Sequence, residues 1–201
     1  MFNQKSFTYN TTLLRFGLIE NFELRLGLEF LGEEIENKHS DSINTNLGLS
    51  PMYAGFKVKI AEEDGRKPEI AFIGGLVLPF TANDYFKPEY SAANVRFSFA
   101  HTLSERFSIG YNLGAEWDGE SAAPGYFYSL AIGVEVSNKL GMFFESYGLL
   151  QEERNDEHML DAGFTYLLLP NLQLDISVGI GIIETAVDNF ISFGLSYRVP
   201  N

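Results

Sequence analysis

The residues that could carry chemistry are few and scattered along the chain. The chain contains three histidines, His39, His101 and His158, and no cysteine, and the histidines lack the spacing of metal ligands. The stretch "SFAHTLSER" combines His101 with serines, as a serine hydrolase requires. Ser98 and His101, however, differ in parity and would point to opposite faces of a regular strand. We therefore expect no catalytic residue, no metal site and no cofactor.

Other patterns also favour plain structural roles. The acidic run "EERNDEHMLD" lacks the spacing of an EF-hand and is typical of a solvated loop. The glycines of "VGIGI" and "IGGL" do not join a strand to a helix, so they indicate relief of crowding and not a nucleotide site. The formal net charge of −13 argues against binding to nucleic acid, because phosphate recognition needs clustered Lys and Arg.

Alternation of apolar and polar residues is the dominant signal of the chain. In "LQLDISVGIGI" every second residue from Leu172 to Ile182 is aliphatic, and the residues between them are polar or glycine. A period of two residues predicts β-strands. The same pattern predicts strands in "FELRLGLEF", "RFSIGYNLGAEW", "YFYSLAIGVEV" and "NFISFGLSYRV". Segments rich in aromatic and β-branched residues predict six further strands, at 11–18, 51–60, 69–80, 94–103, 140–150 and 158–169.

The predicted connections alternate in length. Short turns are predicted at 19–21, 62–67, 103–106, 137–139 and 169–171, and longer polar links at 32–46, 81–90, 118–125, 151–157 and 184–189. Antiparallel strands joined in this way place all the short turns at one end and all the long loops at the other. Bacterial outer-membrane barrels have this arrangement, with turns in the periplasm and loops outside the cell.

The alternation fits two kinds of barrel that differ in which face meets water. The polar face is mostly Gly, Ser, Ala and Asn with scattered charges of both signs, which suits a crowded lumen better than a soluble surface. Aromatic residues such as Phe107, Trp117 and Tyr197 collect near strand ends, where a girdle at the membrane interface would lie. These features favour an all-β, antiparallel, up-and-down transmembrane β-barrel. A soluble, lipocalin-like ligand-binding calyx is the alternative.

By alternation, fourteen charged residues are predicted to line the lumen. They could line a path for solutes and set its charge selectivity. Alternatively, opposite charges on neighbouring strands could pair with each other inside a closed interior. The inward-pointing rings of Tyr53, Phe127, Phe143 and Tyr147 could stack on an aromatic solute or simply pack. The charged candidates are Arg15, Glu23, Arg25, Glu29, Lys57, Lys59, Arg96, Arg106, Glu116, Glu135, Glu145, Asp161, Asp175 and Arg198.

The predicted strand count bears on the start of the chain. Single-chain bacterial barrels close with an even number of strands, and about eleven are predicted here. Counting back through the hairpins places "MFNQKSFTYN" in an extracellular loop. We therefore expect residues 1–201 to be a single barrel domain of about twelve strands when complete, with a signal peptide and a first strand upstream.

Several longer phrases carry a resemblance to a known family. The phrases are "TTLLRFGLIENFELRLGLEFL", "GLSPMYAGFKVKIAEEDGRKPEIAFIGGLVLPF", "LSERFSIGYNLGAEWDGE" and "LDAGFTYLLLPNLQLDISVGIGI". They resemble the outer-membrane β-barrel transporter family of the MetA pathway of phenol degradation. The resemblance implies transport of small, aromatic molecules, and it supplies no binding residues to carry over. The chain ends in Asn201 and departs from the terminal aromatic residue that is usual in outer-membrane proteins.

Together these observations predict a channel or transporter of the bacterial outer membrane, and not an enzyme. The expected partners are the lipid bilayer and a small-molecule solute that crosses by passive diffusion, while the oligomeric state is left open. The alternatives are a structural barrel with a plugged lumen and the soluble calyx.

Overall fold

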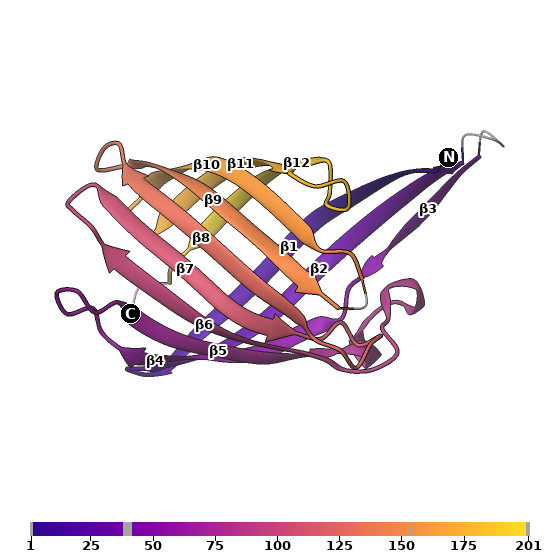
Figure 1. Cartoon of the computed structure of the whole chain (residues 1–201), viewed down its shortest axis with the longest axis horizontal. Helices are drawn as coiled ribbons and strands as arrows, with labels where there is room; N and C mark the ends of the chain where they lie inside the picture. The colour runs from indigo at the N-terminus through magenta and orange to yellow at the C-terminus, as the bar shows by residue number, and fades with distance from the viewer. Residues whose placement is uncertain (1, 38–41, 153, 200–201) are drawn as a thin grey trace. The chain divides into compact units, whose positions relative to one another are not determined.

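The computed structural model describes residues 2–37, 42–152 and 154–199. These residues are mostly β-strand, with two short 3-10 helices, η1 (Pro79–Thr81) and η2 (Asp84–Phe86). The strands belong to one twelve-stranded antiparallel sheet (Figure 1). The strands are β1 (Phe2–Ile19), β2 (Phe22–Asn37), β3 (Ser42–Leu49), β4 (Met52–Ala61), β5 (Glu69–Leu78), β6 (Ala92–Thr102), β7 (Phe107–Glu116), β8 (Gly125–Glu135), β9 (Leu140–Gln151), β10 (Glu157–Leu169), β11 (Leu172–Gly181) and β12 (Asn189–Tyr197).

The strands pair in the order in which they occur along the chain. Eleven of them follow each other in the order β1-β2-β4-β5-β6-β7-β8-β9-β10-β11-β12, and β3 pairs with β2 off this path. Each segment that alternation and composition predicted as a strand forms one, and apart from β1 and β2, which extend further, the ends differ by at most two residues. The predicted strand 69–80, for example, ends at Leu78 and continues into η1. The connectivity is up-and-down, as expected from the alternation of short turns and long loops.

Two compact units make up the chain. The first comprises Met1–Val58, Ile73–Val95 and Glu116–Ala122, and the second comprises Lys59–Phe72, Arg96–Ala115 and Ala123–Asn201.

In the first unit, β2 serves as the partner of two successive strands. Its residues Phe30–Asn37 pair with β3, and its residues Phe22–Gly27 pair with β4. Only Ser50 and Pro51 separate β3 from β4. Proline has no N–H group to donate to a ladder, so it interrupts a strand that otherwise continues along the same edge of β2. Hence β3 and β4 occupy one position in the sheet, and the number of positions agrees with the predicted number of strands.

The start of the chain and the first predicted loop differ from expectation. Residues 2–10 belong to β1 and pair with β2, so the placement of "MFNQKSFTYN" in a loop is wrong. The link predicted over 32–46 is also largely strand, because β2 extends to Asn37 and β3 begins at Ser42. These segments carry polar residues on both faces and show no period of two. Backbone pairing does not require an apolar face, so strand structure here has no sequence signal.

In the second unit, β8 to β12 run side by side as a meander of hairpins (Figure 1). Serines shape the turn of one of these hairpins and the turn that joins β6 to β7. The hydroxyl of Ser137 accepts hydrogen bonds from the backbone N–H groups of Lys139 and Leu140, at 3.3 and 3.1 Å. Ser104 accepts in the same way from the N–H groups of Arg106 and Phe107. Serine favours such turns because its side chain can replace a backbone acceptor.

The two faces of β11 differ sharply in exposure. On β11 the side chains of Leu174, Ile176, Val178 and Ile180 are 38 to 55% exposed. The residues that alternate with them, Gln173, Asp175, Ser177 and Gly179, are partly or fully buried. We call the face that carries these aliphatic side chains the apolar face, and the opposite side the polar face.

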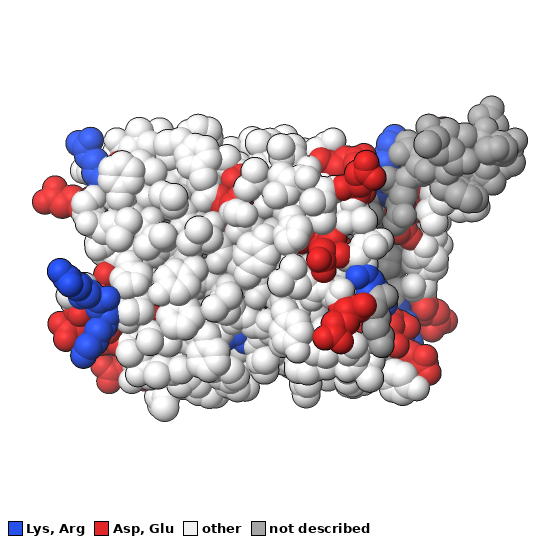
Figure 2. All heavy atoms as spheres, viewed as in Figure 1, with Lys and Arg blue, Asp and Glu red and all other residues white. Residues whose placement is uncertain are grey.

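The apolar face is extensive, and there is almost no apolar core. Among the described residues, the buried hydrophobic side chains are only Ala71, Ala92, Met159 and Ala186. Figure 2 shows that mostly uncharged side chains cover the strands on the viewed side, where β7, β8 and β9 lie. A soluble protein rarely exposes an apolar surface of this kind, and a lipid-facing surface has this composition. The soluble calyx, which needs its aliphatic side chains inside, is therefore wrong.

Aromatic residues are exposed at several strand ends, as a membrane interface requires. Phe107 opens β7 with 48% exposure, Tyr126 lies at the start of β8 with 51%, and Tyr197 closes β12 with 58%. In the described part of the chain, no helix is both long and apolar enough to cross a membrane.

Candidate functional site

On the polar face of the first unit, five predicted lining residues lie on β1, β2 and β4. Directly paired residues of antiparallel strands point to the same side of a sheet. The register pairs Arg15 with Arg25 and Glu23 with Lys57, so these four side chains share one face. Glu29 lies on the same face of β2, and the Thr11 hydroxyl lies 3.5 Å from its carboxylate.

Part of this charge is compensated locally. Arg25 Nε donates a hydrogen bond to Glu23 Oε1 at 2.8 Å, and the two side chains are only 14% and 27% exposed. The two residues are two positions apart on β2, so they lie side by side on one face. This contact is of the kind expected if opposite charges pair within the interior.

In the second unit, the polar face of β8 to β11 is acidic. Glu145 on β9 pairs directly with Asp161 on β10, Glu135 pairs with Gly141, and Asp175 pairs with Thr165. Within the described residues, Asp161 Oδ1 is buried and has no hydrogen-bond partner. The register therefore brings Glu145 and Asp161 together. Glu135 and Asp175 lie on the neighbouring strands β8 and β11.

The basic candidates of the second unit are dispersed. Arg96 places its guanidinium carbon 4.4 Å from the ring centroid of Phe127, which is the distance of a cation–π contact. Lys59 forms a 2.8 Å ion pair with Glu62 beyond the end of β4. Arg106 and Arg198 lie just outside β7 and β12 and are exposed.

Two of the four predicted aromatic candidates on the polar face, Tyr53 and Phe143, cover glycines. The ring of Tyr53 lies over Gly55 and Gly75, where any added Cβ would collide with it, and Tyr53 Oη donates to the Gly74 carbonyl at 3.4 Å. Phe143 covers Gly163, where a Cβ would lie 2.6 Å from the ring. These contacts agree with the interpretation that glycine relieves crowding, and they favour packing as the role of both rings.

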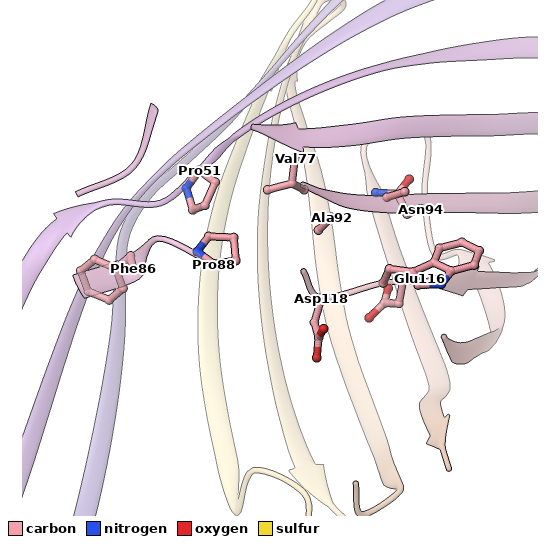
Figure 3. A pocket seen from close by; sticks show the side chains of 10 residues that line it. Pro51, Val77, Phe86, Pro88, Ala92, Asn94, Glu116 and Asp118 are labelled. Atoms are coloured by element: carbon pink, nitrogen blue, oxygen red, sulfur yellow. The ribbon is translucent and has the colours of Figure 1, made fainter. Parts of the chain in front are cut away.

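A pocket of the first unit contains the remaining acidic candidate, Glu116. Its volume is about 350 Å³, and it lies where β5, β6 and β7 meet the long loop between β5 and β6. Figure 3 shows Pro51, Phe86 and Pro88 on one side of the pocket and Asn94, Glu116 and Asp118 on the other. Trp117 also lines the pocket, so it is half-buried among loop residues and is not part of an exposed girdle.

The sequence did not reveal this pocket, because residues 81–90 read only as a polar link. The signal available was the three aromatic rings and the proline within the seven residues "DYFKPEY", which are unusual for a solvated loop. The loop folds back on its own unit. Leu49 N–H donates to Asn83 Oδ1 at 2.6 Å, Met52 N–H donates to Thr81 Oγ1 at 2.8 Å, and the Tyr85 hydroxyl donates to Glu33.

Comparison with known proteins identifies the family. Residues 2–199 match the family described as "Putative MetA-pathway of phenol degradation". The chain belongs to this family. No curated protein matches the chain.

A solved structure supports the fold of this MetA-pathway family member. The chain is similar to an outer membrane channel from Pseudomonas putida F1, with a TM-score of 0.70 and 14% sequence identity. The match covers 92% of this chain and 79% of the channel. Together with the apolar face, it confirms the expected fold class, an antiparallel up-and-down transmembrane β-barrel, and its place in the outer membrane.

The histidines of this family member have structural contacts. His101 stacks on Tyr111 with ring centroids 6.1 Å apart, and His158 shares a hydrogen bond with Tyr128. His39 lies outside the described residues. No group of three or more His, Cys, Asp or Glu residues in the described ranges is arranged to hold a metal. The absence of catalytic activity stays a prediction.

Proposed function

We propose that the whole chain forms one outer-membrane β-barrel domain that lets small solutes, aromatic molecules among them, cross the membrane by diffusion. The observation that carries this proposal is the segregation of the two faces. Aliphatic side chains such as Ile176 and Val178 are exposed, while charged residues lie on the polar face of β1, β2 and β4 in the first unit and of β8 to β11 in the second. Similarity of fold to an outer membrane channel supports the same conclusion.

In this mechanism the polar face solvates a permeating molecule, and no bond is made or broken. The width of the path and the charges along it select the solute. Glu135, Glu145, Asp161 and Asp175 lie on four neighbouring strands of the second unit, and this wall favours cations over anions. Aromatic solutes would be stabilised by stacking on rings such as Phe127, which also contacts the Arg96 guanidinium.

The direct test is conductance of the purified protein in planar lipid bilayers. We expect step-like openings, with a reversal potential in a KCl gradient that indicates a preference for cations. Replacing both members of the Glu145–Asp161 pair (Glu145→Gln and Asp161→Asn) should shift that potential toward anions. Glu105→Gln, in the exposed turn before β7, is the matched control and should leave it unchanged. Folded protein that gives no conductance would contradict the proposal.

A structural barrel with a filled interior is the second candidate. Tyr53 over Gly55 and Gly75, and Phe143 over Gly163, favour it because rings at these places take up interior volume. Liposome swelling separates the two functions. A channel lets arabinose enter, and it admits benzenesulfonate at least as fast as methanesulfonate if aromatic solutes are preferred. A filled barrel with heat-modifiable migration on gels admits none of the three.

A further inference from the structure

The pocket beside Trp117 has the features of a built binding site. Its volume of about 350 Å³ lies within the range of small-molecule sites, which is about 300–1,000 Å³. Its walls come from strand ends and from two loops that are far apart in the sequence (Figure 3).

Backbone hydrogen bonds hold those two loops together. Tyr90 N–H donates to the Gly119 carbonyl at 2.8 Å, and Trp117 N–H donates to the Ala93 carbonyl at 2.8 Å. The N–H of Glu89 donates to the Glu120 carboxylate at 3.1 Å. The pocket is therefore preorganised, and a ligand does not have to order the loops when it binds.

The 117–121 turn is itself fixed by a side chain of the pocket. Asp118 Oδ1 accepts hydrogen bonds from the N–H groups of Glu120 and Ser121, at 2.7 and 2.9 Å. Gly119 has a positive φ of 81°, a conformation that glycine adopts without strain. These features set the position of Trp117 relative to the β5–β6 loop.

The lining combines aromatic and aliphatic surface with negative charge. Trp117 and Phe86 supply rings, Pro51, Pro88 and Val77 supply apolar contact, and Glu116 and Asp118 supply two carboxylates. Indole rings are the strongest partners of cations in cation–π contacts, and carboxylates add Coulomb attraction.

We propose that this pocket binds a small organic cation, in which an ammonium group is joined to a compact apolar or single-ring body. The ammonium lies near Glu116 and Asp118, and the apolar body lies between Trp117 and the prolines. If the pocket loads a solute for transport, that role rests on the proposed channel function. Binding itself does not depend on transport.

Trp117 makes the test direct, because it is the only tryptophan of the chain. The full chain in detergent micelles is titrated at constant ionic strength with benzyltrimethylammonium, benzyl alcohol and benzenesulfonate, which differ mainly in charge. We expect a saturable change of Trp117 fluorescence with the cation, at a dissociation constant about five- to tenfold lower than with the alcohol. Equal or weaker binding of the cation overturns the proposal.

Charge-removing variants give the second readout. Glu116→Gln keeps the shape of the side chain, and Asp118→Asn keeps the Oδ1 acceptor on which the turn depends. We expect the double variant to lose most of the preference for the cation while its binding of benzyl alcohol is unchanged. Glu105→Gln, in the turn between β6 and β7, should behave as the wild type. If the double variant retains the full preference, the carboxylates do not recognise the ligand and the proposal is wrong.

The outcomes separate this site from the channel. Saturable binding of the cation by a protein that conducts no ions refutes the channel and leaves the site. Conductance without preference for benzyltrimethylammonium in the fluorescence titration refutes the site and leaves the channel.

Discussion

Tyr128 and His158 join their side chains across an intervening strand. Tyr128 Oη lies 2.8 Å from His158 Nδ1, and the two residues pair with opposite sides of Gly148 on β9. A Cβ atom at Gly148 would lie 2.8 Å from both His158 Nδ1 and Tyr128 Cε1. The hydrogen bond between β8 and β10 therefore depends on the absence of a side chain at position 148.

Replacing Gly148 should lower the free energy of unfolding more than removing the Tyr128 hydroxyl. Gly148→Ala forces the two side chains apart and crowds the Glu157 carbonyl, so we expect the free energy of unfolding to fall by about 1–3 kcal/mol. Tyr128→Phe removes one hydrogen bond and should cost about 1 kcal/mol. Urea unfolding in lipid vesicles measures both, with Tyr126→Phe, on the same strand, as the control. A Gly148→Ala variant as stable as the wild type would show that the strands adjust freely.

Gly119 should be equally sensitive, for a different reason. Its φ of 81° disfavours any side chain, and an added Cβ would collide with the Tyr90 carbonyl. We expect Gly119→Ala to separate the 117–121 turn from the β5–β6 loop, at a cost of about 1–3 kcal/mol. The emission of Trp117 should shift to the red, and residues 81–90 should become more sensitive to protease. Gly65→Ala is the control, because it also has positive φ but meets no neighbouring atom. Unchanged emission in Gly119→Ala would contradict the role of this contact.

The strands of the second unit were predictable because one face must be apolar throughout. On β11 the lipid-facing positions permit only residues such as Leu174 and Ile176, so the alternation is complete and fixes both strand and face. The turns predicted at 103–106 and 137–139 are present, and the structure shows that the hydroxyls of Ser104 and Ser137 accept backbone hydrogen bonds there. The polar face was predictable for the same reason, because residues that alternate with the apolar ones point to the opposite side of the strand.

Where no face of a segment has to be apolar, the sequence did not predict the structure. The pairing of β2 with β3 rests on backbone hydrogen bonds between segments whose side chains are polar on both faces, so no period appears. The pocket depends on contacts between residues far apart in the sequence, such as Tyr90 and Gly119. Twelve of the fourteen charged candidates lie on strands, whereas Arg106 and Arg198 lie just outside β7 and β12. Alternation gives no information on which of these residues meet, as Glu145 and Asp161 do.

The contact between Glu63 and Thr102 should make one strand end sensitive to acid. Glu63 accepts the Thr102 N–H at 2.6 Å and the Thr102 hydroxyl at 2.8 Å, and these bonds, the backbone one above all, lower the pKa of Glu63 below its ordinary value of 4.5. Because the pKa is lower in the folded state, the stabilisation is complete above about pH 4.5 and is lost as the pH falls through the folded-state pKa.

Hydrogen exchange of the Thr102 amide tests this acid sensitivity. After correction for intrinsic exchange, we expect its protection to fall in acid for the wild type and to be lower and independent of pH in Glu63→Gln. Glu105→Gln, in the adjacent turn, should keep the acid dependence of the wild type. The same pH dependence in Glu63→Gln as in the wild type would assign the effect to another group.

The strongest prediction concerns two adjacent residues on β11 with opposite surroundings. Ile176 is 39% exposed on the apolar face, whereas Ser177 lies on the polar face, opposite Gly163 and Ser192 of the neighbouring strands. An arginine on the lipid side of a barrel strand costs about 2–4 kcal/mol near the middle of the bilayer. We therefore expect Ile176→Arg to lower the unfolding free energy in vesicles by about that amount, and Ser177→Arg to lower it much less, because the polar face already carries charged residues and does not meet lipid. In detergent micelles, where water reaches the charge more easily, the difference should shrink. Equal costs for the two arginines in vesicles would mean that the apolar face does not meet lipid, and the membrane-spanning assignment would fail with it.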